Sequence, residues 1–127
     1  MMKQSVFRIY CVDDDADVRI SVERLLDSAG FHIETFASSR LFMDSVPVHL
    51  ETGVLILDLR MPGMDGFTLL KKMQEYGSKF KIIFITGDAQ PEDRDRALRS
   101  GAIGFLQKPF QEESLFELIR KAMREAQ

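Results

Sequence analysis

Four polar sites follow short apolar segments of the sequence, each at the point where such a segment ends. They are the acidic cluster Asp13–Asp15, Asp58, Thr86 and Lys108. An aspartate directly after four large apolar residues is costly to desolvate, so Asp58 indicates chemistry rather than packing. In open α/β sheets, ligands bind beyond the carboxyl ends of parallel strands, and all four sites would lie at that edge.

Each of these sites has a simpler interpretation when it is taken alone. The acids could cap a helix, Asp58 could cap a turn, Thr86 could be a capping hydroxyl, and Lys108 could be one more surface lysine. The four sites recur once per strand–helix unit and would share a single sheet edge. That recurrence favours one common site over four unrelated ones.

The residue types at this edge suit phosphoryl chemistry on a carboxylate. Carboxylates crowded within a few ångström repel one another unless a hard cation joins them, and few oxygen ligands suit Mg²⁺. A carboxylate can attack phosphorus and form an aspartyl phosphate. Such a transfer needs metal, ammonium and hydroxyl groups around the equatorial oxygens, which Asp14 with Mg²⁺, Lys108 and Thr86 would supply.

Alternating strands and helices are predicted to position these residues. Apolar or β-rich segments predict strands at 6–12, 31–36, 54–57, 80–86 and 102–106. Apolar periodicity, capping residues and glycine or proline stops predict helices from Val18 to Gly30, from Ser38 or Ser39 to Pro47, from Asp65 to Gly77, over 91–100 and over about 111–125. This order predicts one domain over 1–127, an α/β fold with a doubly wound (βα)5 five-stranded parallel sheet.

The fourth predicted helix differs from the others in its composition. Its apolar residues are Ala97 and Leu98, and two acidic–basic pairs are spaced for ion pairing, Glu92 with Arg96 and Asp95 with Arg99. Such pairs contribute only a few tenths of a kcal/mol each. The helix is therefore predicted to pack weakly and to move easily.

Composition excludes several classes of protein. A hydrophobic content of 45% with 29% charged residues is ordinary for a soluble globular domain, and the net charge of −3 argues against nucleic-acid contact. The single cysteine, Cys11, allows no intramolecular disulfide. No signal peptide and no apolar run of about 20 residues is present, so a cytoplasmic location without membrane contact is predicted.

Four sequence motifs contain the polar residues of the predicted site. They are Val12-Asp13-Asp14, Asp58-Leu59-Arg60-Met61-Pro62-Gly63-Met64-Asp65-Gly66, Thr86-Gly87, and Gly101-Ala102 through Phe105 to Lys108-Pro109-Phe110. Together they resemble the CheY-like response regulator receiver domains of bacterial two-component signalling, over about residues 6–125. The arginine at position 60, shortly after Asp58, resembles the pattern of the FixJ/LuxR-type subfamily, in which the receiver domain often precedes a helix-turn-helix. The resemblance implies a flavodoxin-like strand order 2-1-3-4-5 and a cis Lys108–Pro109 peptide.

The resemblance also implies a role for each residue of the site. Asp58 would accept a phosphoryl group from a phosphohistidine of a sensor histidine kinase, and the chain would catalyse only its own phosphorylation and dephosphorylation. Mg²⁺ (or Mn²⁺) would be held by Asp13, Asp14, Asp58 and the backbone carbonyl of Arg60. Thr86 and Lys108 would bind phosphoryl oxygens, and Phe105 stands at the aromatic switch position.

Two surfaces of the domain are expected to carry the signal. Phosphorylation would draw Thr86 toward the phosphoryl group and let Phe105 turn inward. This would reshape the face of the fourth helix, the last strand and the last helix, where Phe116 and Met123 widen the apolar stripe. We expect this face to support output and a phosphorylation-favoured homodimer. Kinase docking is expected on the first helix around Ile20.

Arg60 and Asp88 are predicted to tune the lifetime of the phosphoryl group. Each lies two residues after a site residue, Asp58 and Thr86 respectively. In similar receiver domains these positions flank the path of the hydrolytic water, which must approach in line with the leaving oxygen. An ion pair between Arg60 and Asp88 would bridge the mouth of the site and slow hydrolysis.

The chain departs from the family pattern in two respects, and other classes compete with it. Phe105 lacks the hydroxyl that a tyrosine would offer a partner, and the chain ends at Gln127 with no output domain, so it either stands alone or belongs to a longer regulator. Haloacid dehalogenase-type phosphatases need a second acid where Arg60 stands. Flavodoxin-like cofactor binders prefer a glycine-rich loop after the first strand. A phosphate-independent interaction module would not need Asp58, Thr86 and Lys108 together.

Overall fold

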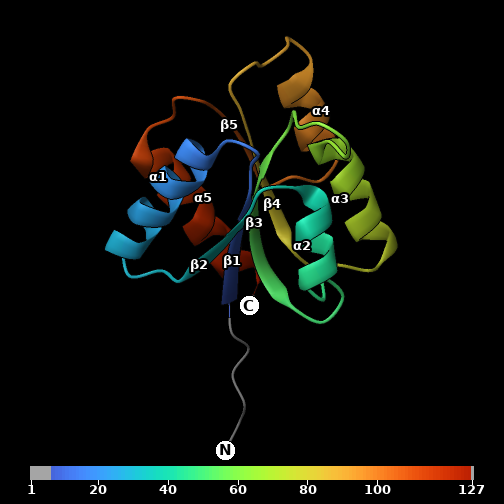
Figure 1. Cartoon of the computed structure of the whole chain (residues 1–127), viewed down its shortest axis with the longest axis horizontal. Coiled ribbons are helices and arrows are strands. Elements are labelled where there is room, and N and C mark those ends of the chain that lie inside the picture. The colour runs from blue at the N-terminus through green and yellow to red at the C-terminus, as the bar shows by residue number, and fades with distance from the viewer. Residues whose placement is uncertain (1–6, 127) are drawn as a thin grey trace, which may run out of the picture.

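A computed structural model describes residues 7–126, which form a parallel sheet covered by helices on both faces (Figure 1). The strands are β1 (Phe7–Val12), β2 (Ile33–Phe36), β3 (Thr52–Asp58), β4 (Lys81–Thr86) and β5 (Gly104–Gln107). Their order is β2-β1-β3-β4-β5, with every neighbouring pair parallel, so the predicted fold class and strand order are confirmed. The predicted first residue of the first strand, Val6, lies outside the described residues.

Five helices connect and follow the strands. They are α1 (Ala16–Ser28), α2 (Ser39–Ser45), α3 (Gly66–Glu75), α4 (Asp93–Arg99) and α5 (Glu112–Glu125). Asp15, Ser38 and Asp65 each accept a hydrogen bond from a backbone N–H of the following helix, which satisfies a donor that the first turn leaves free. Within residues 7–126, no helix is long and apolar enough to cross a membrane.

The two faces of the sheet carry separate hydrophobic clusters. Leu57 and Phe84 belong to the cluster beneath α2, α3 and α4, and Ile56 and Ile85 belong to the cluster beneath α1 and α5 (Figure 1). Since successive strand residues point to opposite faces, the unbroken apolar runs of β3 and β4 are buried on both sides. Each fully buried side chain contributes about 1.5–3 kcal/mol, so the ends of these strands are firmly fixed.

Gly66 lets α3 begin directly beside the end of β3. A Cβ atom at this position would lie 2.9 Å from the backbone carbonyl oxygen of Asp58 and 2.9 Å from a ring atom of Phe84. The N–H of Gly66 donates to the carbonyl of Leu59 at 3.0 Å and closes the intervening turn. A larger residue would displace the backbone that carries Asp58.

The apolar packing of α4 is slight, as predicted. Ala97 is its buried apolar residue, and Leu98 is 48% exposed. The helix is shorter than the predicted 91–100. A turn precedes it, in which the N–H of Asp93 donates to the carbonyl of Gln90 at 3.0 Å, so Pro91 lies before the helix rather than in its first turn.

Polar contacts replace the ion pairs predicted for α4. Over the described residues, neither Glu92 with Arg96 nor Asp95 with Arg99 forms an ion pair, so this prediction is wrong. The guanidinium of Arg96 instead lies 4.0 Å from the ring centroid of Phe67 on α3. A cation above an aromatic face gains more than an exposed pair of charges along a helix.

The two apolar residues of α5 that were predicted to widen the output face pack toward the cluster beneath α1 and α5 instead. Phe116 is half-buried and stacks on Phe31, which precedes β2, with 6.5 Å between ring centroids. Met123 packs against the same cluster beneath α1 and α5. The prediction that these two residues widen the face of α4, β5 and α5 is therefore wrong, because Phe116 packs on Phe31 and Met123 packs against the cluster beneath α1 and α5.

Candidate functional site

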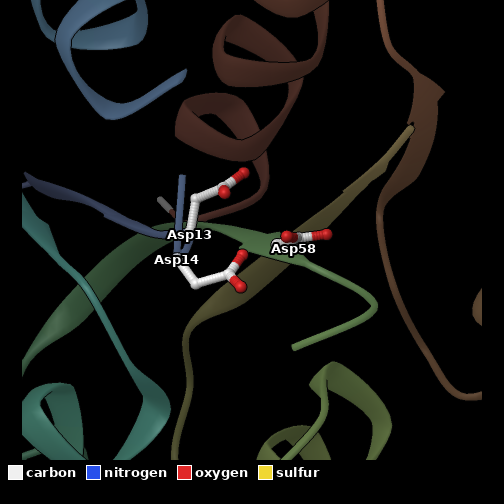
Figure 2. A group of neighbouring side chains, drawn as sticks. All are labelled: Asp13, Asp14 and Asp58. Carbon is white, nitrogen blue, oxygen red and sulfur yellow. The ribbon is translucent and has the colours of Figure 1, made fainter. Parts of the chain in front are cut away.

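The carboxyl ends of β1 and β3 bring three aspartates together (Figure 2). Val12 pairs with Leu57 in the register of the two strands, so Asp13, Asp14 and Asp58 follow at the same level. One carboxylate oxygen from each aspartate lies within 4.8 Å of the others. Asp13 and Asp58 are buried, whereas Asp14 is exposed.

Asp13 is the most firmly held carboxylate of the three. Its Oδ1 accepts the backbone N–H of Asp15 at 2.9 Å, and its Oδ2 accepts a hydrogen bond from Lys108 Nζ at 2.8 Å. Lys108 Nζ also lies 3.7 Å from Asp58 Oδ2. The ammonium group therefore lies between two of the acids. It makes a charge-assisted hydrogen bond to Asp13 and a longer ion pair with Asp58.

Arg19 belongs to this site and was not predicted from the sequence. Its Nη1 donates to the backbone carbonyl of Asp13 at 2.7 Å, from the first turns of α1. The contact fixes the loop that carries Asp13 and Asp14. Its only signal in the sequence is a position within one helical turn of the capping residue Asp15, which many surface arginines share.

Burial dominates the electrostatics of Asp58. The pKa of this carboxyl is raised to about 7, chiefly by burial and next by the neighbouring charge of Asp13, while Lys108 acts in the opposite direction. For Lys108, burial alone would lower the pKa. The hydrogen bond to Asp13 and the charges of Asp13 and Asp58 outweigh burial, so the pKa of Lys108 is raised. The pocket therefore holds more negative charge than its own lysine neutralises.

This donor set fits a hard divalent cation. The three aspartates offer one oxygen each at close range, with one open, solvent-facing side at Asp14 where water ligands have room. Mg²⁺ prefers a few carboxylate oxygens with retained waters, and its charge would relieve the repulsion that raises the pKa of Asp58. The group contains no thiolate or imidazole, which softer metals would favour.

Thr86 and Lys108 reach the same edge from β4 and β5. Asp58 pairs with Ile85 in the register of β3 and β4, so Thr86 follows directly beside the acidic group. The N–H of Lys108 donates to the backbone carbonyl of Thr86 at 2.8 Å. The Thr86 hydroxyl is buried and accepts the N–H of Asp88 at 3.2 Å. The four predicted sites are thus gathered at one edge of the sheet.

The Lys108–Pro109 peptide bond matches the prediction, whereas the Phe105 ring does not. The peptide bond between Lys108 and Pro109 is cis, as predicted. Phe105 is already buried, at 5% exposure, and the guanidinium of Arg94 lies 5.2 Å from its ring centroid. The expected outward ring, ready to turn inward, is therefore absent from this conformation of the described chain.

The predicted ion pair between Arg60 and Asp88 is not formed. Arg60 Nε donates to the backbone carbonyl of Asp88 at 3.4 Å, and Arg60 Nη2 pairs with the carboxylate of Asp93 at 2.5 Å. The Asp88 carboxylate instead accepts a hydrogen bond from Gln90 Nε2 at 3.4 Å. Asp93 prevails because it is buried, so its carboxylate cannot be solvated and needs a cation.

Comparisons with known proteins agree with this geometry. The sequence matches the response regulator receiver domain family over residues 9–120. It is 42% identical to the transcriptional regulatory protein FixJ of Bradyrhizobium diazoefficiens, across 94% of this chain and 58% of that protein. It is 41% identical to the response regulator protein TmoT of Ectopseudomonas mendocina, across 91% of this chain and 52% of that protein.

A solved structure extends the likeness to three dimensions. Full-length FixJ from B. japonicum superimposes with a TM-score of 0.86 and 40% sequence identity, across 98% of this chain and 61% of that one. The chain thus spans somewhat more than half the length of each of these relatives. The family match over residues 9–120 includes every strand end that carries a site residue.

Proposed function

The chain belongs to the response regulator receiver family of two-component systems, and from that premise we propose that Asp58 is its phosphoacceptor. One observation carries the proposal. Asp58 ends a central buried strand with two further carboxylates inside 4.8 Å and the ammonium of Lys108 at 3.7 Å. Receiver domains generally bind Mg²⁺, and this cluster has the composition that such an ion requires.

Each residue of the site has a defined task in the proposed transfer. An Asp58 oxygen forms a bond to phosphorus while the bond from phosphorus to the donor histidine nitrogen breaks, and the released imidazole takes up a proton. Lys108 and the Thr86 hydroxyl neutralise and bind the phosphoryl oxygens. Mg²⁺, which neutralises charge on these oxygens when bound, would be held by Asp13, Asp14, Asp58 and the backbone carbonyl of Arg60. The chain turns over only its own phosphoryl group.

The proposed phosphoryl donor is a sensor histidine kinase that docks beside α1. Ile20 is 46% exposed on the outward face of α1, where a partner could contact it. A mainly apolar hollow of about 470 Å³ lies between α1 and the segment after β5. It is lined by Val18, Leu25 and Phe110 and reaches Lys108, so a partner helix seated there would place a histidine near the acceptor.

The proposed output surface is formed by α4, β5 and α5. A hollow of about 560 Å³ on this face is lined by Leu98, Phe105 and several cationic side chains. We propose a phosphorylation-favoured homodimer through this surface. The similar FixJ protein is a transcriptional regulator longer than this chain, so we propose transcription as the output, through a DNA-binding segment outside the given sequence.

The phosphoacceptor role is tested by mass spectrometry after incubation with acetyl phosphate and Mg²⁺. We expect one added phosphoryl group on a peptide containing Asp58, and none in Asp58→Asn. Asp44→Asn, an exposed aspartate on α2, is the matched control and should be phosphorylated normally. A phosphoryl group that persists in Asp58→Asn would reject the assignment, as would complete absence of labelling in the unaltered protein.

A further inference from the structure

Asp93 is a buried carboxylate that the proposed phosphoryl transfer does not use. It is 3% exposed and is the first residue of α4. One of its oxygens, Oδ2, accepts both the backbone N–H of Gln90 at 2.7 Å and a hydrogen bond from Arg60 Nη2 at 2.5 Å. Arg60 is its ion-pair partner within the described residues. A buried carboxylate with one cation depends strongly on that cation.

Arg60 is tied at its other end to the phosphoacceptor. Its backbone N–H donates to Asp58 Oδ1 at 3.3 Å, and its side chain extends across to the β4–α4 segment. The guanidinium makes no ion pair with Asp58 among the described residues. The residue therefore spans from the reacting carboxylate to the start of α4, with its charge held at the α4 end.

Phosphorylation would set up a competition for this guanidinium. A phosphoryl group on Asp58 brings nearly two negative charges and three strong acceptor oxygens next to the backbone of Arg60. Guanidinium groups bind phosphoryl oxygens with two parallel hydrogen bonds. The carboxylate of Asp93 opposes that movement, because removal of Arg60 would leave it buried without a cation.

We propose that Asp93 is a positioning residue that holds the Arg60 guanidinium at the start of α4, away from the phosphoryl group, and so sets the lifetime of the phosphorylated state. This inference rests on the proposed phosphoacceptor role of Asp58. It replaces the lid predicted from Arg60 and Asp88, because the carboxylate that competes for Arg60 is that of Asp93.

The step affected is hydrolysis of the acyl phosphate. Water forms a bond to phosphorus as the bond from phosphorus to the Asp58 oxygen breaks, which releases dihydrogen phosphate and leaves the Asp58 carboxylate. The water must approach in line, opposite the leaving oxygen. A guanidinium released from Asp93 would move onto the phosphoryl group and obstruct that approach.

Two substitutions test the proposal through their dependence on one another. Asp93→Asn removes the charge but keeps an oxygen that can accept the N–H of Gln90. We expect phosphoryl loss from Asp58, measured at fixed Mg²⁺, to slow by about threefold or more in Asp93→Asn. Arg60→Ala should not slow the loss, because no guanidinium remains that could move onto the phosphoryl group. The double variant should match Arg60→Ala, because Asp93 acts only through Arg60.

Two control variants separate positioning from a general loosening of α4. Asp95→Asn alters an exposed charge on the same helix. Arg96→Ala removes the contact with Phe67 that fastens α4 to α3, without touching Arg60. Both should lose phosphoryl at the unaltered rate. If Asp93→Asn fails to fold, Asp93→Ser, which also keeps an acceptor oxygen and removes the charge, replaces it with the same expectation.

The outcomes are distinct from those of the phosphoacceptor test. An unaltered protein that takes up phosphoryl, with an unchanged rate of loss in Asp93→Asn, rejects the positioning role and leaves the phosphoacceptor role intact. Faster loss in Asp93→Asn also rejects it, since it would mean that a released guanidinium assists hydrolysis. A change of equal size in Arg96→Ala would assign the effect to the mobility of α4 and reject the role of Asp93.

Discussion

Lys108 Nζ donates a hydrogen bond to Asp13 Oδ2 at 2.8 Å and lies nearly an ångström farther from the Asp58 carboxylate, at 3.7 Å. The lysine thus chiefly neutralises an aspartate that is completely buried. In the proposed phosphoryl transfer, the same ammonium would also bind the phosphoryl oxygens. Lys108 therefore donates its hydrogen bond to Asp13 in the unphosphorylated protein, and would divide its hydrogen bonds between Asp13 and the phosphoryl group in the phosphorylated one.

The first prediction concerns this pair. Lys108→Met keeps the aliphatic stem but leaves Asp13 buried without its cation, so unfolding in urea without metal should require about 3 kcal/mol less free energy. Lys71→Met, an exposed lysine on α3, is the control and should change stability by less than about 0.5 kcal/mol. Equal stability of the two variants would show that Asp13 is solvated rather than buried.

The second prediction concerns the crowded acids. Asp58→Asn removes a buried carboxylate whose pKa is raised to about 7, so the melting temperature at pH 8 without metal should rise by about 3–8 °C. Asp14→Asn should raise it less, because Asp14 is exposed. Mg²⁺ should stabilise the unaltered protein more than either variant. A lower melting temperature in both variants would contradict a repulsive pocket.

The third prediction is the pH dependence of stability without metal. The pKa of Asp58 is raised from 3.8 to about 7 in the folded protein, so between these values the folded state binds more protons than the unfolded state. The contribution of Asp58 to the free energy of unfolding is therefore fully present below pH 4 and is lost as the pH rises through 7. Lys108, with its raised pKa, stays protonated throughout this range.

Urea unfolding at pH 5 and pH 8 measures this effect directly. Between pH 5 and pH 8, the free energy of unfolding should fall more in the unaltered protein than in Asp58→Asn. The asparagine does not titrate, so its contribution does not change with pH. Saturating Mg²⁺ should reduce the difference, since the ion binds the ionised carboxylate. A difference between the two pH values that is identical in both proteins would remove Asp58 as its cause.

The fourth prediction concerns the proposed dimer. Sedimentation in the presence of a phosphoryl mimic should show dimer for the unaltered protein and monomer for Leu98→Glu, which places a charge in the apolar part of the α4–β5–α5 face. Leu50→Glu is the control, since Leu50 is 74% exposed on the loop between α2 and β3. An identical monomer fraction with and without the mimic would reject the phosphorylation-favoured dimer.

The arrangement of the site followed from the sequence because it depends on topology alone. Buried apolar runs fix which residues end each strand, and parallel strands share one carboxyl edge. Asp58, Thr86 and Lys108 could therefore be placed together although 50 residues separate the first from the last. No knowledge of side-chain conformation was needed for that step.

The partners of long side chains could not be inferred in the same way. Arg60 could reach either Asp88 or Asp93, and the choice depends on the turn before α4 and on the burial of Asp93. Phe116 follows a helical stripe that leads equally well to the output face or to Phe31. Periodicity gives the direction of a side chain from its own helix, but not which neighbour occupies that direction.

The composition of the α4 interface has a consequence for how the domain responds to temperature. Ala97 is the one small apolar side chain that α4 buries over the described residues, while Arg96 and Asp93 make charged contacts. Exposure of apolar surface is the main source of heat-capacity change in proteins. A displacement of α4 would therefore have a small heat-capacity change, and its van 't Hoff plot would be nearly straight. If phosphorylation displaces α4, the enthalpy of that displacement would therefore be nearly the same at all temperatures at which the protein works.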